Sequence, residues 1–478
     1  MSTSKKQILL TGASGKMGQA ALAELFQRTN RCQVRALALD TPADRKILGP
    51  FQKKGLEVIW GDLTCYQDVL QAVSGADIIL HVGGLVSPLA DTQPELTMKV
   101  NIGAAANIVR AVKQSGQAKR TKLVYIGSVA QTGNRPVPIH WGRVGDPIKL
   151  SAFDTYALSK TIAERIIIDS GIKNWVSLRQ TGIARMAAAE PLDPITFHTT
   201  LDGVLEWITP GDSGRLLANI CEDGIPEEFW GEIYNIGGGA PNRLTNLELF
   251  DLMLRATGVQ DYREVLDPRW FALQNFHGQW FADSDRLEEI VPFRHQTIEQ
   301  YIEEQKQGVP WYIRIGSAIP RLVRRKFESV ARGPRGTLDW LARGDLAHIK
   351  AYFGSFQRWK NISDWDSISQ RPPSRVPVLL DHGYDQNKSP QEMTQEEIKD
   401  AALFRGGRLL SKSINLGDWT SPLTWCCHAG HEFNASLNLI LKGGHWCPVC
   451  VSEPRTYPEL ARHSAFFRQV WEPELVSF

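Results

Sequence analysis

Three side chains in the sequence could together move a proton to or from a substrate oxygen. Tyr156 and Lys160, in "DTYALSKTIAER", stand four residues apart in an amphipathic stretch, so a helix would present them on one face. A nearby ammonium group favours the phenolate, which lets a tyrosine exchange a proton with an alcohol or carbonyl near neutral pH. Ser128 ends the apolar run "KLVYIGS" and could hydrogen-bond the same oxygen. A Tyr-x-x-x-Lys pair alone is common on surface helices, so its meaning depends on the surrounding elements.

A glycine-rich turn lies between the first apolar run and the first helical stretch. "TGASGKMG" contains Gly12, Gly15 and Gly18. The first glycine suits a tight turn, the second lets the backbone approach a diphosphate, and the third allows close packing of helix on strand. Free N–H groups at the start of the helix would face the anion. The alternative is a chance glycine turn, but its position in a strand–helix–strand series favours dinucleotide binding.

Two acidic residues follow the next strand-like runs. Asp40 comes after "VRALAL", where a carboxylate could bind the adenosine ribose and repel a 2′-phosphate. This favours NAD over NADP, although Arg45 and Lys46 follow closely. Asp62 could contact the adenine amine, or it could cap the helix that begins in "DLTCYQDV". We give these two interpretations of Asp62 equal weight.

The C-terminal part holds a candidate metal site made of Cys427, His431, Cys447 and Cys450. The C-x-x-x-H and C-x-x-C spacings can close a tetrahedral Zn²⁺ site, and four protein ligands leave no open position, which favours a structural role. His428 and His445 are competing ligands, and Cys426 is left over. A disulfide framework is disfavoured because the chain is long and has no secretion signal.

The elements that must position these groups alternate along the chain. Strand-like runs are "QILLTG", "QVRALAL", "LEVIWGD", "ADIILHVG", "KLVYIGS" and "WVSLRQTG", with helix-like stretches between them, and "GEIYNIGGG" begins a later strand–turn–helix unit. This alternation predicts an α/β fold, a doubly wound parallel sheet with helices on both faces. We expect a smaller substrate-binding part after the sheet and a small metal-binding domain at the C-terminus.

Length and composition set further limits. The 478 residues suggest two to four domains, and we predict boundaries at 1–325, 326–400 and 401–478, with the polar stretch 361–400 as a linker. The 54 basic and 52 acidic side chains nearly balance, which disfavours nucleic acid as a partner. The sequence has no signal peptide and no apolar run of membrane-spanning length, so we expect a cytoplasmic protein with no membrane partner.

Residues 1 to about 320 resemble the extended short-chain dehydrogenase/reductase family, the NAD-dependent epimerase/dehydratase group. The matching pieces are "TGASGKMG", "GDLT", "HVGG", "VNIGAAANIV", "YIGSVA", "YALSK", "LRQTGIA" and "YNIGGG". The resemblance implies a Rossmann-type fold and an NAD(P) cofactor. It also implies that Tyr156 is the general acid/base, that Lys160 binds the nicotinamide ribose and lowers the tyrosine pKa, and that Ser128 positions the substrate oxygen. Asn101 would complete the proton relay.

The same resemblance implies a set of cofactor-binding residues: Gly12, Ser14, Gly15, Lys16, Met17, Gly18, Asp40, Asp62, Leu63, Gly83, Tyr156 and Lys160. Gly83 would lie beside the cofactor, where family members often have alanine. Residues 405–451 resemble a zinc-ribbon family, which implies a bound Zn²⁺ held by Cys427, His431 and the C-x-x-C pair. Members of the extended short-chain dehydrogenase/reductase family often dimerise through two helices, so the first resemblance also implies a homodimer.

Departures from the family pattern limit the substrate. Val129 and Ala130 replace the Asp-Glu pair of sugar-nucleotide 4,6-dehydratases, which disfavours that chemistry. "LRQTGIAR" replaces an "RYFN"-like segment of the epimerases, so a smaller or less sugar-like substrate is plausible. Residues in segments that border the pocket, each as readily structural as substrate-binding, are His81, His140, Trp141, Arg143, Arg179 and His198.

Three functions are therefore carried forward. The first is an NAD(P)-dependent oxidoreductase that transfers a hydride between nicotinamide and an alcohol or ketone carbon. The second is an NAD-dependent epimerase of a sugar or sugar derivative. The third is a dinucleotide-sensing regulatory or nucleic-acid-associated protein that recognises its partner through the zinc-ribbon-like domain.

Overall fold

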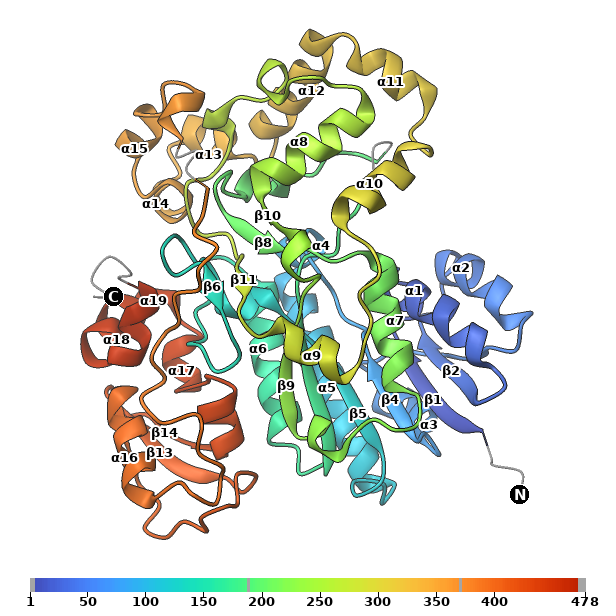
Figure 1. Cartoon of the computed structure of the whole chain (residues 1–478), viewed down its shortest axis with the longest axis vertical. Helices are drawn as coiled ribbons and strands as arrows, with labels where there is room; N and C mark the ends of the chain where they lie inside the picture. Colours follow the sequence, from blue (N-terminus) through green and yellow to red (C-terminus); the bar gives the residue numbers. More distant parts are fainter. Residues whose placement is uncertain (1–4, 187–189, 369–371, 472–478) are drawn as a thin grey trace.

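The computed structural model describes residues 5–186, 190–368 and 372–471 (Figure 1). Outside the described residues lie 1–4 and 187–189 of the predicted region 1–325, 369–371 of the predicted linker, and 472–478 of the predicted region 401–478. A large sheet occupies the N-terminal half. A helical part lies above it in Figure 1, and the C-terminal part lies beside helix α6.

The large sheet has seven parallel strands in the order β3-β2-β1-β4-β5-β7-β9. Its strands are β1 (Lys6–Thr11), β2 (Cys32–Ala38), β3 (Glu57–Trp60), β4 (Ile78–His81), β5 (Lys122–Ser128), β7 (Asn174–Gln180) and β9 (Glu232–Ile236). Apolar runs with little alternation form these strands because both of their faces are buried. The predicted doubly wound parallel sheet is confirmed.

Helices cover both faces of the sheet. The helices connecting the strands are α1 (Lys16–Leu25), α2 (Pro42–Gln52), α3 (Tyr66–Val73), α4 (Leu89–Thr92), α5 (Pro94–Gln114), α6 (Thr155–Ile168) and α7 (Pro210–Ile220). Helix α9 (Ser284–Ile290) follows the last strand of this sheet and packs on β9. Helices α1 and α7 pack together on one face, and α3, α5 and α6 pack side by side on the other. No helix within the described residues combines the length and apolarity needed to cross a membrane.

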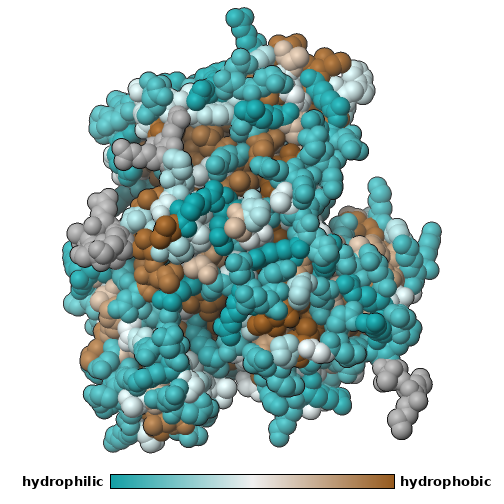
Figure 2. Space-filling view, viewed as in Figure 1, coloured by the Kyte–Doolittle hydropathy of each residue, from teal (hydrophilic) through white to brown (hydrophobic). Residues whose placement is uncertain are grey.

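The part above the sheet consists mainly of helices, with four short strands among its described residues. These are β6 (Trp141–Gly142), β8 (Val204–Glu206), β10 (Arg243–Thr245), β11 (Trp280–Phe281), α8 (Asn246–Thr257), α10 (Ile298–Lys306), α11 (Trp311–Ser317), α12 (Pro320–Arg332), α13 (Thr337–Arg343), α14 (Leu346–Phe353) and α15 (Phe356–Lys360). The face shown in Figure 2 is largely hydrophilic, with apolar side chains at the upper end, where α11 and α12 lie. Trp311, Ile315 and Leu322 of this region are exposed.

The C-terminal part is a small three-stranded antiparallel sheet with helices around it. Its elements are α16 (Gln395–Phe404), β12 (Gly407–Leu409), β13 (Leu423–Cys427), β14 (Glu432–Ala435), the π-helical turn η9 (Asn438–Lys442), α17 (Pro448–Val451), α18 (Tyr457–His463) and α19 (Ala465–Trp471). The predicted small C-terminal unit therefore has its own sheet.

This C-terminal part shares a hydrophobic core with the large sheet. One cluster of buried side chains runs from Leu9 and Ala105 of the sheet and its helices to Leu437, Leu439 and Trp446 of the C-terminal part. The turn η9 packs directly on α6. Polar groups cross the same boundary: Ser436 donates to Asp169, and Lys442 forms an ion pair with Glu232. The two regions are joined by a buried interface and not merely by a connecting segment.

The central part of the predicted linker, residues 374–382, is held against the rest of the chain. Residues 372–394 contain no helix or strand, in line with their polar, proline-bearing sequence. The Ser374 carbonyl accepts hydrogen bonds from both His140 and Trp141, and Arg143 donates to the Leu380 carbonyl at 2.7 Å. Farther along, the buried His382 ring hydrogen-bonds the Asp146 carboxylate at 2.9 Å. Although its backbone is irregular, this stretch is therefore fixed to the rest of the chain by hydrogen bonds.

We expect Leu439→Ala to destabilise the whole chain and not only its C-terminal part. Leu439 is buried in the shared core, and truncating a buried leucine typically costs about 2–5 kcal/mol. Chemical denaturation followed by tryptophan fluorescence measures the change. Leu403→Ala is the matched control because Leu403 is 64% exposed. Independent unfolding of the C-terminal part, with the sheet unaffected, would contradict the shared core.

Candidate active site and metal site

The glycine turn has the tight geometry that a diphosphate site requires. Gly12 has φ +69°, in the left-handed region that favours glycine, and Gly15 N–H donates to the Gly12 carbonyl at 3.0 Å. A Cβ on Gly18 would lie 2.1 Å from the Gly12 oxygen, so a larger residue there would have to move the backbone. Gly15 directly precedes α1, and its exposed position leaves the first turn of that helix open to a ligand.

The turn meets the end of β4 where the strand order reverses. Strands β1 and β4 are neighbours, and a Cβ on Gly12 would lie only 2.7 Å from the Gly83 Cα. Thr11 Oγ1 accepts from the Gly83 N–H at 2.9 Å and also contacts the His81 ring, which fixes the two strand ends together. Ligands of open α/β sheets bind in the crevice at such a reversal.

Gly84 is a further residue at this crevice that the sequence analysis did not single out. A Cβ on Gly84 would lie 2.7 Å from the Asn101 Oδ1 and 3.8 Å from the Lys160 Nζ. Side-chain volume at this position would therefore press on two predicted site residues. The adjacent glycines of "HVGG" were the available signal, but only Gly83 was assigned a role.

The remaining predicted cofactor residues lie around the turn. Ser14 is half-buried and its carbonyl accepts from the Gln19 side chain at 2.6 Å, while Lys16 is exposed and Met17 is buried. Leu63 lies across from Gly83: a Cβ on that glycine would be 2.8 Å from Leu63 Cδ1. The structure therefore brings both sides of the predicted cofactor crevice together.

Asp40 lies two residues beyond β2 and is paired with Arg45. The carboxylate accepts from Arg45 Nε at 2.5 Å and Nη2 at 2.8 Å, and the guanidinium lies 4.6 Å from the Trp60 ring centroid. The hydrogen bond from Arg45 lowers the pKa of Asp40. A carboxylate and a guanidinium therefore both stand at the position where a ribose or a 2′-phosphate would be recognised.

Asp62 begins a turn and does not cap the following helix. Its Oδ1 accepts the Thr64 N–H at 2.7 Å, and its own N–H donates to Asp68. Helix α3 starts at Tyr66 and is preceded by Cys65. The helix-cap interpretation of Asp62 is therefore wrong, because the helix begins later than the sequence suggested.

Ser128 and Tyr156 are close neighbours at the carboxyl end of the sheet. Ser128 is the last residue of β5, and Tyr156 lies in the first turn of α6, whose cap is the Asp154 side chain. Burial raises the pKa of Tyr156 to about 12, while a hydrogen bond from Ser128 acts in the opposite direction. The phenol is consequently held in its protonated form.

Lys160 follows Tyr156 on the same helix but turns its ammonium toward the sheet. Its Nζ donates to the Ile126 carbonyl at 2.7 Å and lies 5.1 Å from the Tyr125 ring centroid. Burial lowers the pKa of Lys160 to about 8, and Glu164 opposes this shift. The expected lowering of the tyrosine pKa by Lys160 is not seen here, because burial dominates at Tyr156.

Asn101 is buried in α5 and links the loop after β4 to the catalytic helix. Its Nδ2 donates to Ser159 Oγ at 2.8 Å and to the Leu85 carbonyl at 3.0 Å, and its Oδ1 accepts from the Leu85 N–H. Asn101 therefore lies within the group of predicted catalytic residues. Its contacts hold the loop and α6 together.

A cavity of about 130 Å³ lies next to the start of α6. Its lining includes Ser87, Asp154, His198, Trp340, His348 and Tyr352. The last three come from α13 and α14, which stack their rings: Trp340 lies 4.7 Å from both His348 and Tyr352. Helices α13 and α14 thus form one wall of the cavity that Phe153 and Asp154 line just before α6, a contribution that no motif in the sequence indicated.

Most of the polar residues considered near the pocket have structural partners. His81 is buried, and burial lowers its pKa to about 3, so it is a neutral ring beside Thr11. Arg179 is paired with Glu164 and is 1% exposed. His140, Trp141 and Arg143 bind the stretch 372–394, whereas His198 lines the cavity.

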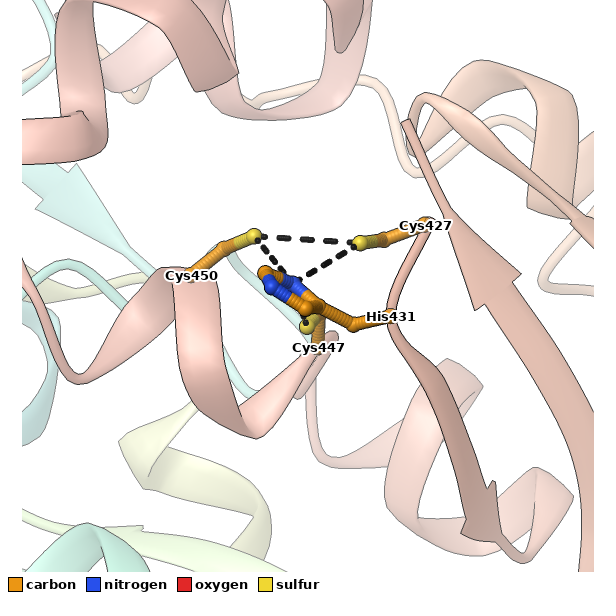
Figure 3. Close-up of side chains that lie close together, drawn as sticks. All are labelled: Cys427, His431, Cys447 and Cys450. Atoms are coloured by element: carbon orange, nitrogen blue, oxygen red, sulfur yellow. Dashed lines mark hydrogen bonds between the residues drawn. The ribbon is translucent and has the colours of Figure 1, made fainter. Parts of the chain in front are cut away.

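The four predicted metal ligands converge in the C-terminal part (Figure 3). Their ligand atoms all lie within 4.8 Å of one another. Cys427 Sγ is 3.8 Å from Cys450 Sγ, and the three sulfur atoms lie 3.4 to 3.6 Å from His431 Nδ1. A tetrahedral Zn²⁺ with Zn–S bonds of about 2.3 Å needs sulfur atoms about 3.8 Å apart, so this donor set fits the ion.

The competing ligands point elsewhere. Cys426 contacts the Cys427 carbonyl through its sulfur, and His428 stacks on His463 with ring centroids 5.0 Å apart. His445 hydrogen-bonds Glu164 at 2.8 Å, away from the cluster. Strand geometry explains the first case, since adjacent residues of β13 face opposite sides.

Part of this chain is similar to known dehydrogenases. Residues 9–185 match the model of the 3-beta hydroxysteroid dehydrogenase/isomerase family. The 3 beta-hydroxysteroid dehydrogenase type 7 of Mus musculus is 28% identical over 167 residues, which cover 34% of this chain and 44% of the relative. A 3-beta-hydroxysteroid dehydrogenase of Mycolicibacterium neoaurum is 26% identical over 188 residues, 37% of this chain and 47% of the relative. The chain thus spans less than half the length of these relatives.

Solved structures share the fold at lower identity. The dTDP-glucose 4,6-dehydratase DesIV double mutant of Streptomyces venezuelae, with NAD and DAU bound, superposes with a TM-score of 0.51 at 19% identity, covering 63% of this chain and 95% of that chain. The dTDP-glucose 4,6-dehydratase of Bacillus anthracis in complex with NAD gives 0.51 at 15% identity, covering 67% and 99%. The predicted resemblance is therefore confirmed: the N-terminal region has the fold of these structures, and residues 9–185 match the family model.

Proposed function

We propose that the protein is an NAD-dependent oxidoreductase that interconverts an alcohol and a ketone. The observation that carries this proposal is the meeting of Ser128, Tyr156 and Lys160 with the Gly12 turn at one edge of the sheet. Such a combination provides a proton donor, a group that orients the substrate oxygen and a dinucleotide site within one crevice. The relatives named for hydroxysteroid dehydrogenation support the same reaction class.

The chain's own residues have separate tasks in this proposal. Ser128 would orient the substrate oxygen, and Tyr156, held as a phenol, would give its proton to a carbonyl during reduction. In the oxidising direction the phenolate form of Tyr156 would take the proton of the alcohol. Lys160 would bind the ribose and pass protons, with Asn101 holding the loop beside it. Bound NAD would supply the hydride acceptor or donor. Its site would consist of the glycine turn with Ser14, Lys16 and Met17, together with Leu63, Asp62 and Gly83.

NAD is proposed over NADP because Asp40 presents a carboxylate where the adenosine ribose would lie. Its partner Arg45 weakens the repulsion that this carboxylate would exert on a 2′-phosphate, since the two charges are paired. The structural neighbours solved with NAD support the same choice.

The substrate proposed is an alcohol or ketone with an apolar face. Trp340 and Tyr352 supply flat apolar surface, while Asp154 and His198 supply polar groups in the same cavity. Val129 and Ala130 are buried apolar residues, so this stretch has no carboxylate for dehydration chemistry. A sugar-like substrate and epimerisation form the second candidate, because the same tyrosine would serve a hydride that returns to the opposite face. Net change in nicotinamide absorbance during turnover distinguishes the two.

We also propose that Cys427, His431, Cys447 and Cys450 bind a structural Zn²⁺. Four protein donors would fill a tetrahedral ion and leave no position for a substrate. The homodimer, the cytoplasmic location and the domain boundaries at 325 and 400 stay predictions from the sequence.

Tyr156→Phe should abolish turnover and leave NAD binding intact. The substitution removes the proton that the phenol supplies, while the ring keeps its packing. Nicotinamide absorbance in a screen of alcohols and ketones measures turnover, and calorimetry measures the NAD affinity. Tyr312→Phe is the control, because Tyr312 is exposed in α11. Undiminished biological activity in the Tyr156 variant would favour the dinucleotide-sensing function instead.

Gly18→Ala should weaken NAD binding by about tenfold or more, equivalent to about 1.4 kcal/mol. The added Cβ would collide with the Gly12 oxygen and force the diphosphate turn to open. Calorimetric titration with NAD measures the affinity. Gly103→Ala is the matched control, because a Cβ at that helical glycine meets no atom within 4 Å. Unchanged NAD affinity in Gly18→Ala would argue against this turn as the diphosphate site.

Cys450→Ser should remove the stoichiometric zinc and lower the melting temperature. The ion would lose one of four donors, and a structural zinc contributes directly to folding. Elemental analysis gives the metal content, and thermal unfolding gives the stability. Cys426→Ser should retain the metal, because that sulfur lies outside the cluster. Equal metal loss in both variants would contradict the assigned ligand set.

A further inference from the structure

A buried carboxylate connects the active site to the C-terminal part. Glu164 lies on α6 and is 0% exposed. It accepts five hydrogen bonds, from Gln131, Ser177, two nitrogens of Arg179, and His445. We call Glu164 and these four partner residues the Glu164 network. Burial alone would raise the pKa of Glu164, but Arg179 and His445 outweigh it and hold the pKa well below its ordinary range.

On one side the network reaches the predicted catalytic residues. Glu164 lies one helical turn after Lys160 and two turns after Tyr156, so its position fixes the rotation of α6. Gln131 donates to Glu164 Oε2 at 2.7 Å and accepts the Ser128 N–H at 2.8 Å. Moving the carboxylate would therefore disturb both the helix that carries Tyr156 and the backbone of Ser128.

On the other side the network reaches the segment that leads into the metal ligands. His445 Nε2 donates to Glu164 Oε2 at 2.8 Å, and Arg179 donates to the Gly443 carbonyl at 2.7 Å. Arg165, the next residue of α6, donates to the Trp446 carbonyl at 3.0 Å. Residues 443–446 are followed directly by Cys447, one of the proposed metal ligands. This segment therefore contacts α6 and its partner Arg179 on one side and leads into the metal cluster on the other.

The local backbone leaves little freedom in this segment. Gly444 has φ +70°, and a Cβ there would lie 2.1 Å from the Asp146 carbonyl oxygen. The pair "GG" in "KGGHWCPVC" therefore lets the segment approach the loop that follows β5. His445 is 1% exposed and directed at Glu164 by this close approach.

We propose that Glu164 is a positioning residue through which the metal-holding C-terminal part sets the geometry of Ser128, Tyr156 and Lys160. The proposal rests on the oxidoreductase function proposed above. Metal binding at Cys447 orders residues 443–446, these residues hold the carboxylate through His445 and Arg179, and the carboxylate holds α6 and Ser128. The metal ion touches no substrate and acts only through this chain of contacts.

The first test removes the His445 side chain, which lies in neither the proposed active site nor the proposed metal site. His445→Ala should lower kcat by about tenfold or more, because small misplacements of catalytic groups cost rate steeply. The Kd for NAD should change much less than kcat, since the glycine turn lies outside the network and only Lys160 and Tyr156 among the proposed NAD contacts depend on it. His445→Gln keeps an N–H donor and should restore most of kcat. His463→Ala is the matched control, an exposed histidine of the same C-terminal part that pairs with Glu459.

Metal content and the melting temperature are measured for each variant, and kcat is compared well below the melting temperature. A merely structural role would lower the melting temperature of His445→Ala without a selective loss of kcat, and it would not predict rescue by glutamine. Unchanged kcat in a folded, zinc-loaded His445→Ala protein would overturn the proposal.

The second test needs no substrate. Amide hydrogen exchange of the full chain is recorded with zinc bound and after chelation. We expect faster exchange in α6 and at Ser128 to Gln131 after chelation, while β1 and α1 stay protected. Confinement of the change to residues 401–471 would overturn the proposed coupling. Because this measurement does not depend on turnover, coupled exchange in a protein that oxidises no alcohol would reject the oxidoreductase function and keep the link.

Discussion

The buried carboxylate of Glu164 is the constraint on which the arrangement of this molecule depends. Removing one partner of such a buried pair typically costs about 3–5 kcal/mol, because a charge is left in a low-dielectric environment without compensation. Its partners come from the sheet, the loop after β5 and the C-terminal part. These three regions must therefore assemble together for the carboxylate to be satisfied.

This requirement joins the dinucleotide-type fold to the C-terminal part that holds the Cys427, His431, Cys447 and Cys450 cluster. The face of the sheet covered by α3, α5 and α6 does not end in solvent; its core continues into the C-terminal part. The loop between β5 and α6 is also bound from the C-terminal side, where Leu150 donates to Tyr457 and Lys149 to the Val470 carbonyl. The C-terminal part thus supports the two elements that carry Ser128 and Tyr156.

Sequence patterns predicted the features that depend on local spacing. Six apolar runs became strands of the sheet, and the C-x-x-x-H and C-x-x-C pairs converge. Features set by contacts between distant residues could not be predicted. Glu164 and His445 are separated by 281 positions, and nothing in "AERIII" or "GGHWC" indicates that they meet. Spacing alone left open whether Asp62 caps a helix, and α3 begins only at Tyr66. The aromatic wall of α13 and α14 follows no repeating pattern.

The location of the metal cluster also restricts what a metal could do here. Its four donors come from β13, the turn before β14 and α17 with the residue before it, and none of them lines the cavity next to the start of α6. An ion held by four protein groups has no position for a substrate oxygen. Any influence on turnover must then pass through packed atoms, and the segment 443–446 offers a direct polar route to α6. Under the proposal above, an ion at these four donors would act on α6 because both ends of that route are buried and hydrogen-bonded.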